Sequence, residues 1–487
     1  MRISKMPEEA GIPSAGIASF LERLEREKYN LHSIQICRDG ETVFSAAVAP
    51  FTIQSPHRLF SAAKAIISLP VLFAIQEGKM RFEDHVIDFF PEMIPAKRSD
   101  NLCRMTVYDL MTMQTGMKSD PFVQLLQDES TDLVRCFFET PVEMRPGTGF
   151  RYNNSVPHVL YTLVERATKT DFETYLNSHV CEPLEAPITA QYSSSGIYNP
   201  LTTVMSNESL LHIGEFYTQF GSWKGHQLID ERLMRYATRY HVPTDPNQKC
   251  WKEESGYGMQ VMRNSYGGFR LPGGFGQFAI CLPDDHLTVS IMSADERIVC
   301  LLDAFREEIY SSIQVKPLPE NWQGVKKLQE AVKNLTYAPE GKEGAAGRDF
   351  PLNRVFHFAL NEHGLQSLSI RQQNNEVLLE ASVNGALLQA RCGMNGEWSL
   401  NQTHFFAQPD RSLQQAIYTA DPEQCFLSGA WTDDNTFTFV QQCLGEMGHT
   451  VCRITYNQEC VSVAWPKPVG MGRATLDGCT VLRSEKE

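Results

Sequence analysis

The stretch Leu59-Phe60-Ser61-Ala62-Ala63-Lys64-Ala65-Ile66-Ile67 decides how this sequence is interpreted, because it places a serine three residues before a lysine at the start of an apolar, helical run. Positions i and i+3 share one face of a helix, so the Lys64 amine can lie beside the Ser61 hydroxyl. If Ser61 opens the helix, its amide is one of the unpaired N–H groups at the positive end and can hold an oxyanion. That positive end and burial both lower the pKa of Lys64, as a general base requires.

An isolated S-x-x-K motif is weak evidence, because serine and lysine are common residues. The alternative is that Ser61 only caps the helix and that Lys64 is an exposed surface residue. A second stretch, R-P-G-T-G-F-R-Y-N-N-S at 145–155, speaks against this alternative. It contains a Y-x-N motif formed by Tyr152 and Asn154, although Tyr152 alone could equally be an aromatic residue packed before a helix that we expect at 156–165.

Together the two motifs resemble those of the serine β-lactamase and penicillin-binding-protein superfamily, which includes class C β-lactamases, D-alanyl carboxypeptidases and related esterases. The resemblance runs from about residue 7 to 305 and implies an α+β catalytic domain, an antiparallel sheet flanked by helices with a helical subdomain. It also implies roles for the matching residues. Ser61 would be the nucleophile, Lys64 and Tyr152 would act together as the base, and Asn154 would orient Lys64 and a substrate carbonyl.

The third motif departs from the family pattern. Family members carry K-T-G or H-x-G on an edge strand, and here the corresponding segment is R-L-P-G-G-F-G-Q-F at 270–278. Leu271 stands where the family has the cation that helps to bind a substrate carboxylate. Arg270 is a poor substitute, because alternate residues of a strand point to opposite faces. Gly273 and Gly274 fit the pattern, and the Gly274 amide is the candidate second oxyanion donor.

Two functional hypotheses follow from the missing cation. In the first, the protein is a serine hydrolase that forms an acyl-enzyme with a small ester or amide without a carboxylate at that place. In the second, it is a catalytically degenerate relative that binds a ligand without turnover. A D-amino-acid peptidase or a β-lactamase is a further alternative. The expected partner is thus a small ester, amide or peptide, and the sequence leaves homo-oligomers open.

The chain has 487 residues, and we expect three parts. These are a catalytic domain at 1–316, a linker with a short helix at 317–349, and an all-β antiparallel barrel or sandwich at 350–487. The third part resembles the lipocalin-like domains of some family members, which suggests that it restricts substrate access. Apolar periodicity predicts a helix from Ser14, and Asp39-Gly40 predicts a hairpin turn. Turns in the last part are expected at dipeptides such as Asn384-Gly385 and Asp477-Gly478.

Composition excludes several other functions. The net charge of −14 disfavours nucleic acid, and no apolar stretch is long enough to cross a bilayer. We expect no cofactor and no metal, since there is no H-E-x-x-H or C-x-x-C pattern. The thirteen cysteines are expected to be reduced, mostly buried thiols in a cytoplasmic protein, because no signal peptide is apparent. His57 is expected in an exposed loop, with the mouth of the pocket as the alternative.

Overall fold

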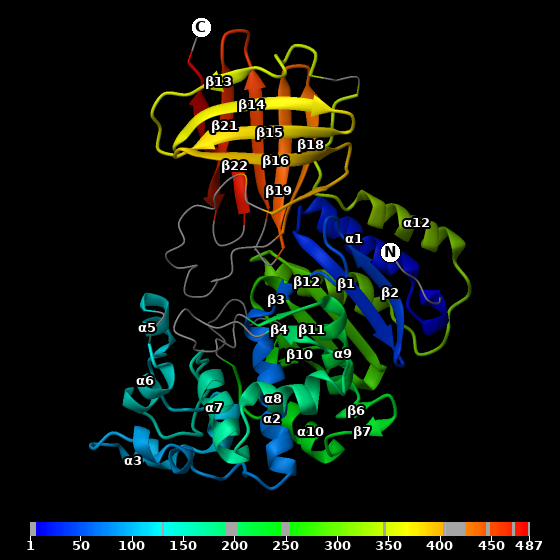
Figure 1. The fold of residues 1–487 in the computed structure, drawn as a ribbon. Helices are drawn as coiled ribbons and strands as arrows, with labels where there is room; N and C mark the ends of the chain where they lie inside the picture. Colours follow the sequence, from blue (N-terminus) through cyan, green and yellow to red (C-terminus); the bar gives the residue numbers. More distant parts are fainter. Residues whose placement is uncertain are drawn as a thin grey trace. The chain divides into compact units, whose positions relative to one another are not determined.

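The computed structural model describes residues 6–128, 131–189, 203–244, 254–343, 347–402, 405, 424–444, 449–469 and 473–485. These residues form two compact units (Figure 1). The described residues of the first unit fall within Met1–Ala47 and Ile53–Val332, and those of the second unit fall within Val48–Thr52 and the chain from Lys333 onward.

The first unit contains most of the helices. Their bounds are α1 Ser14–Arg26, α2 Ala63–Gln76, α3 Asp100–Arg104, α4 Val107–Met111, α5 Phe122–Gln127, α6 Leu133–Glu139, α7 Val156–Thr168, α8 Phe172–Leu176, α9 Asn207–Thr218, α10 Glu231–Thr238 and α11 Ile298–Ala304. The helix α12, Trp322–Asn334, spans the boundary between the two units. The helices predicted from Ser14 and over 156–165 are confirmed.

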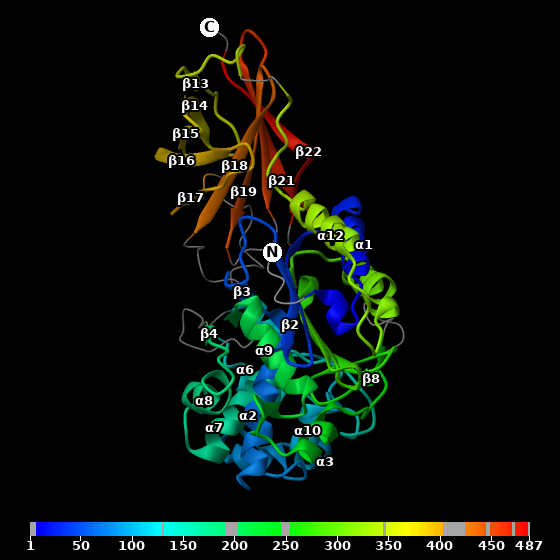
Figure 2. The same cartoon turned by 90° about the vertical axis from the view of Figure 1, so that its right-hand side faces the viewer.

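An antiparallel sheet in the order β2-β1-β12-β11-β10-β9-β8 forms the centre of the first unit. Its strands are β1 Leu31–Arg38, β2 Glu41–Ala47, β8 Glu254–Tyr257, β9 Met262–Asn264, β10 Phe269–Pro272, β11 Phe278–Leu282 and β12 Leu287–Ser293. The hairpin turn predicted at Asp39-Gly40 joins β1 and β2, and both residues have positive φ, 54° and 77°. Figure 2 shows α1 and α9 on opposite faces of this sheet. Short strands outside it are β3 His57–Arg58, β4 Ile188–Thr189, β5 Val204–Met205, β6 Ser222–Trp223 and β7 His226–Gln227.

Helix α2 lies inside the core of the first unit. Every residue from Ala63 to Ala74 is buried, including Lys64. A helix that is apolar on all sides is expected to be enclosed by other elements, and α2 packs against α7, α8 and β10. Its apolar run is nevertheless short: none of the described helices combines the length and the apolar character that a bilayer crossing requires.

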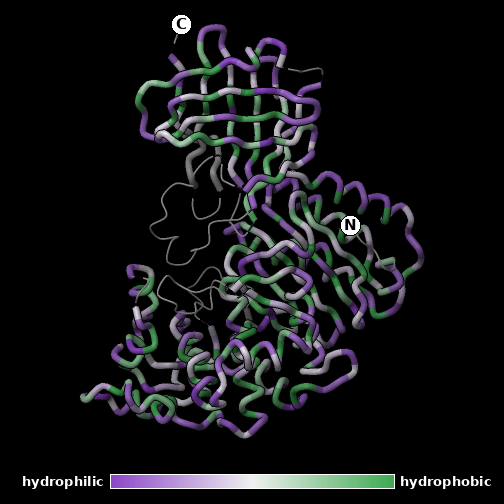
Figure 3. Tube along the Cα trace, in the orientation of Figure 1, coloured by the Kyte–Doolittle hydropathy of each residue, from purple (hydrophilic) through white to green (hydrophobic). Residues whose placement is uncertain are grey.

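The second unit is a curled, almost entirely antiparallel sheet in the order β13-β14-β15-β16-β18-β19-β20-β21-β22. A bridge between Phe358 and Ser484 brings its two ends together, and the pairs β16–β18 and β20–β22 are parallel. Hydrophilic and hydrophobic residues alternate along these strands (Figure 3), as expected for a sheet with one buried face. The strand bounds are β13 Val355–His357, β14 Leu365–Gln373, β15 Glu376–Val383, β16 Ala386–Met394, β17 Ser399–Asn401, β18 Cys425–Asp433, β19 Thr436–Cys443, β20 Thr450–Tyr456, β21 Val461–Val469 and β22 Arg473–Arg483.

The turn predicted at Asp477-Gly478 is wrong, because both residues lie within β22. The pairing of β22 with β21 is irregular at this place. Trp465 pairs with Thr480 and Lys467 with Thr475, so residues 476–479 lie opposite a single residue of β21. Asp and Gly tolerate a turn without requiring one, and here they fall in a bulge of a continuing strand. The turn predicted at Asn384-Gly385 is confirmed by positive φ at both residues.

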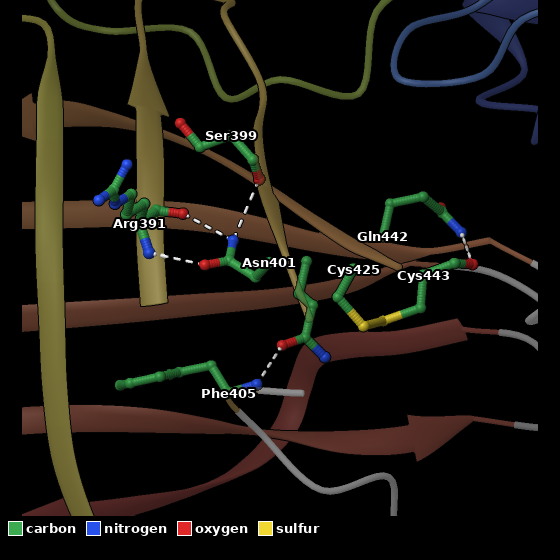
Figure 4. Close-up of a disulfide and its surroundings, with 8 residues drawn as sticks. Arg391, Ser399, Asn401, Phe405, Cys425, Gln442 and Cys443 are labelled. Atoms are coloured by element: carbon green, nitrogen blue, oxygen red, sulfur yellow. Dashed lines mark hydrogen bonds between the residues drawn. A yellow bond between two sulfur atoms is a disulfide. The ribbon is translucent and has the colours of Figure 1, made fainter. Parts of the chain in front are cut away.

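The expectation that all cysteines are reduced is also wrong. Cys425 and Cys443 form a disulfide with an Sγ–Sγ distance of 2.06 Å (Figure 4). The two residues face each other directly in the antiparallel pair β18–β19. They are 18 positions apart in the sequence, and only the strand register brings them together, so no spacing motif marks them. Cys250 lies outside the described residues.

Candidate active site

Ser61 lies in a single 3₁₀ turn, Phe60–Ala62, that leads directly into α2. Phe60 has a φ of 50°, a left-handed conformation that is uncommon for a bulky side chain. Strained backbone of this kind concentrates at functional sites. The turn leaves Ser61 partly exposed, whereas the residues on either side of it are buried. The serine hydroxyl is therefore accessible at the start of a helix whose remaining turns are enclosed.

Lys64 points from the first turn of α2 towards Ser61. Its Nζ lies 2.9 Å from Ser61 Oγ and 3.0 Å from Asn154 Oδ1. The alternative in which Lys64 is an exposed surface residue is wrong, because only 1% of this residue is accessible. Asn154, which comes from the segment just before α7, thus lies within hydrogen-bonding distance of the amine.

Burial lowers the pKa of Lys64 to about 7, because an ammonium group that leaves water loses its hydration. The negative charge of Asp120 acts in the opposite direction and favours the ammonium form. The neighbouring His158 on α7 stays neutral, since burial and then the charge of Lys64 lower its pKa to about 3. The Lys64 amine consequently changes its protonation state near neutral pH, which few lysines do.

Tyr152 is brought to the same place, with its ring beside the amine. Lys64 Nζ lies 4.7 Å from the centroid of the Tyr152 ring, within the range of a cation–π contact. The ring is partly buried and packs against the main core of the unit. A cavity of about 450 Å³ adjoins Tyr152, and its wall also contains Asp120, Phe150 and Asn153. The phenol and the amine therefore converge from stretches of chain about ninety residues apart.

Asp120 is a site residue that the sequence analysis missed. Its carboxylate accepts hydrogen bonds from the backbone amides of Asn154, at 2.7 Å, and Ser155, at 3.3 Å, and from Ser155 Oγ at 2.6 Å. It also accepts the Phe122 amide at 3.0 Å, at the start of α5. The only sequence signal was an aspartate before a short helix, which indicates a local cap and nothing about partners more than thirty residues away.

Gly273 and Gly274 bring the end of β10 against the Ser61 turn. A Cβ atom on Gly273 would lie 2.5 Å from the Leu59 carbonyl oxygen, and one on Gly274 would lie 3.6 Å from the Phe60 side chain. The Gly273 amide donates to the Gln277 carbonyl at 2.7 Å. No hydrogen bond between described residues uses the Gly274 amide, so this N–H is the available one next to Ser61.

Leu271 and Arg270 lie on opposite faces of β10, as the strand alternation predicts. Leu271 is fully buried in the same core cluster as Leu59 and Ala62. Arg270 is also buried, and its Nη1 donates to Asn264 Oδ1 at 2.7 Å. The position that carries a cation in the family pattern is thus occupied by an apolar side chain in this chain.

His57 is not an exposed loop residue, and that expectation is wrong. It lies in β3 with 5% of the residue exposed, and its Nε2 is 2.7 Å from Nδ1 of His32, on β1. Burial lowers the pKa of His57 to about 4, so the His57 ring is neutral at neutral pH. Pairing of β3 with β5 places His57 inside the unit. The sequence around His57 has no strand pattern, so this pairing could not be predicted.

The fold and this site define the class of protein. An antiparallel sheet flanked by helices, with S-x-x-K at the start of a buried central helix, is the β-lactamase and transpeptidase-like fold. The family comparison gives the same result, since the model of the beta-lactamase family matches residues 21–298. The chain belongs to the beta-lactamase family.

The individual proteins that this chain resembles share little sequence identity with it. Esterase EstB of Burkholderia gladioli is 23% identical over an alignment of 200 residues, and the match covers 36% of this chain and 51% of EstB. The chain thus spans about half the length of this curated relative. A penicillin-binding protein homologue from Caulobacter crescentus has a TM-score of 0.48 at 17% identity and covers 62% of this chain and 97% of its own. The octameric penicillin-binding protein homologue from Pyrococcus abyssi has a TM-score of 0.48 at 12% identity, with coverage of 95% and 97%.

Proposed function

We propose that the protein is a serine hydrolase that forms an acyl-enzyme with a small ester or amide. The observation that carries this proposal is the buried Lys64 amine, 2.9 Å from Ser61 Oγ, with a pKa of about 7. A neutral amine at this distance can accept the serine proton as the nucleophile attacks. The esterase name of the relative EstB gives separate support for ester substrates.

In the proposed reaction, Ser61 Oγ attacks the carbonyl carbon and transfers its proton to Lys64, with Tyr152 completing the path to the leaving group. The bond from the carbonyl carbon to the leaving oxygen or nitrogen breaks, and that atom takes up the proton. Water then attacks the acyl-enzyme, which releases the acid and restores Ser61. The amides of Ser61 and Gly274 are the proposed donors to the oxyanion, and Asn154 holds the amine in place.

The apolar Leu271 sets the proposed substrate class. A fully buried leucine offers no charged partner, so a substrate carboxylate on the β10 side would be desolvated without compensation, at a cost of several kcal/mol. Substrates that are neutral on the β10 side are therefore preferred over penicillin-like or peptidoglycan-like substrates that carry a carboxylate there. We also propose that the protein is cytoplasmic and that its parts are bounded at residues 316 and 350.

A fluorophosphonate probe followed by intact-mass measurement tests the proposal. We expect one adduct per chain in the unmodified protein, and none in Ser61→Ala. Ser311→Ala, at an exposed serine of the same unit, is the matched control and should label normally. A panel of p-nitrophenyl esters and D-amino-acid amides then identifies the scissile bond. Failure of every ester, amide and lactam probe to modify Ser61 would instead indicate a protein that binds without turnover.

A further inference from the structure

A second cavity lies at the end of the sheet opposite to Ser61. Its volume is about 710 Å³, and it adjoins the β1–β2 turn at Asp39, the β11–β12 connection at Pro283 and the last turns of α9. Because β11 runs from the Gly273 side of the sheet to Pro283, these two ends are separated by the full length of the strand. The residues of the proposed acylation site are absent from the walls of this cavity.

The carboxyl group of Glu215, on α9, lies in the wall of this cavity although only 8% of the residue is exposed. Its Oε1 accepts a hydrogen bond from Cys37 Sγ at 2.8 Å. Among the described residues, no hydrogen bond uses its Oε2 and no ion pair includes this carboxyl group. A carboxyl group so deeply buried normally has several polar partners, because its desolvation is costly. One oxygen of Glu215 is thus left for a ligand.

The lysine and arginine side chains around the cavity are already paired with carboxylates. Lys224 forms an ion pair with Glu185, and the guanidinium of Arg235 pairs with Glu231 at 2.7 Å. His212 Nδ1 lies 3.0 Å from a backbone carbonyl oxygen of the chain before β4, and His286 is exposed at the rim. Asp39, also at the rim, adds negative charge. Since Lys224 and Arg235 are paired, the carboxyl groups of Glu215 and Asp39 favour a positive ligand in the cavity.

An aromatic wall accompanies the carboxyl group. Trp223, in the β6–β7 hairpin, lines the same cavity and is 93% buried by its neighbours, with 7% exposed. The Lys224 ammonium lies 5.5 Å from its ring centroid and the His212 ring centroid lies 4.9 Å from it, so a ligand has the remaining accessible part of the ring. A carboxyl group beside an indole ring is a common way to hold an organic ammonium ion, through an N–H···O bond and cation–π attraction.

We propose that this cavity binds a small organic ammonium ion, which donates to Glu215 Oε2 and lays its apolar part against Trp223. The site is separate from the proposed hydrolase function and does not depend on it. Burial raises the pKa of Glu215, and a bound cation favours the charged carboxylate, so a proton carried by this carboxyl group is released to solvent when the cation binds.

Calorimetric titration of the full chain with benzylammonium tests this proposal, with benzyl alcohol as the neutral isostere. We expect saturable one-to-one binding of the amine, a heat that varies with the ionisation enthalpy of the buffer, and little binding of the alcohol. Glu215→Gln should weaken amine binding by about tenfold or more. Ser61→Ala should bind the amine like the unmodified protein, which separates this site from the acylation site.

A second variant guards against misfolding of Glu215→Gln. Gln219 lies at the exposed rim of the cavity, so Gln219→Trp fills the entrance and leaves the buried carboxyl group in place. It should also abolish amine binding while circular dichroism and the melting temperature stay unchanged. Equal affinity of the unmodified protein and both variants, loss of binding in Ser61→Ala, or absence of saturable amine binding would overturn the proposal.

Discussion

Lys64 is the residue whose protonation state controls the proposed chemistry. Because its pKa is about 7 and only the neutral form can accept the Ser61 proton, acylation should increase as pH rises through 7 and reach a plateau above it. The measurement is the second-order rate of fluorophosphonate labelling between about pH 5 and 9. A midpoint near that of an ordinary lysine would contradict Lys64 as the base.

Replacing Asp120 should shift this pH profile. The carboxylate favours the ammonium form of Lys64, so Asp120→Asn lowers the pKa of Lys64 further and moves the rise in labelling rate to lower pH. The plateau rate should also decrease, because the side-chain amide introduced at position 120 can accept fewer of the hydrogen bonds that Asn154 and Ser155 donate. A variant that loses rate without any shift of the midpoint would show that Asp120 acts on loop geometry alone.

Lys64→Met should stabilise the fold while it abolishes acylation. The folded state holds the amine with a pKa of about 7 and the unfolded state with 10.5, so the penalty for a buried charge is complete below pH 7 and disappears as pH rises towards 10.5. The penalty is on the order of 5 kcal/mol, less about 1 kcal/mol for each lost hydrogen bond. Thermal unfolding at pH 6 and pH 10 measures it, and the gain should be larger at pH 6.

Individual site residues differed in how far the sequence could predict them. Ser61 and Lys64 share one helix face, so local geometry was sufficient for their contact. The bond from Lys64 to Asn154 spans 90 positions, and only the family resemblance linked the two. Asp120 was missed because its role depends on a loop-to-loop approach. The His57–His32 contact was missed for the same reason, since a two-residue strand leaves no periodic pattern.

At the scale of the secondary-structure elements, the end of β10 packs closely against the Ser61 turn, and both stability and labelling should depend on this contact. Gly273→Ala would place a Cβ atom 2.5 Å from a backbone oxygen that cannot move independently, so strand and turn must separate. We expect a loss of about 1–3 kcal/mol in the free energy of unfolding and a strong decrease in labelling of Ser61. Chemical denaturation and probe labelling measure the two effects.

Gly149→Ala is the control for this prediction, because a Cβ atom there meets open space and the backbone has no positive φ. It should change stability by less than about 0.5 kcal/mol. Equal behaviour of the two alanine variants would show that β10 can withdraw without cost and that the approach of Gly273 does not set the site geometry.

Helices and hairpins were predicted well where a period or a turn dipeptide was strong, as in α1 and in the turn at Asp39-Gly40. The curled sheet of the second unit was predicted as antiparallel strands with turns, and its parallel pairs β16–β18 and β20–β22 were not. These pairs join strands that are not consecutive along the chain, so neither spacing nor turn residues encode them. The bulge at Asp477-Gly478 likewise reflects pairing with β21, which overrides a permissive turn signal.

At the scale of the whole molecule, the Cys425–Cys443 disulfide should add stability to the second unit. It closes a loop of 18 positions, which corresponds to about 3 kcal/mol if chain entropy in the unfolded state dominates. A Cys425→Ala and Cys443→Ala double variant should therefore unfold at lower temperature than the unmodified protein in calorimetry. Reducing agent should lower the melting temperature of the unmodified protein and leave that of the double variant unchanged.

The burial of α2 determines how the first unit loses activity on heating. The segment that presents Ser61 is also the most deeply enclosed helix of its unit, so neither can loosen alone. On heating, probe labelling of Ser61 and the folded structure of the first unit should be lost in the same transition. No temperature range should exist in which the unit is folded and Ser61 is unreactive. Substrate specificity can then change through substitutions in the loops and strand ends around Ser61. Substitutions in α2 itself would destabilise the core of the unit.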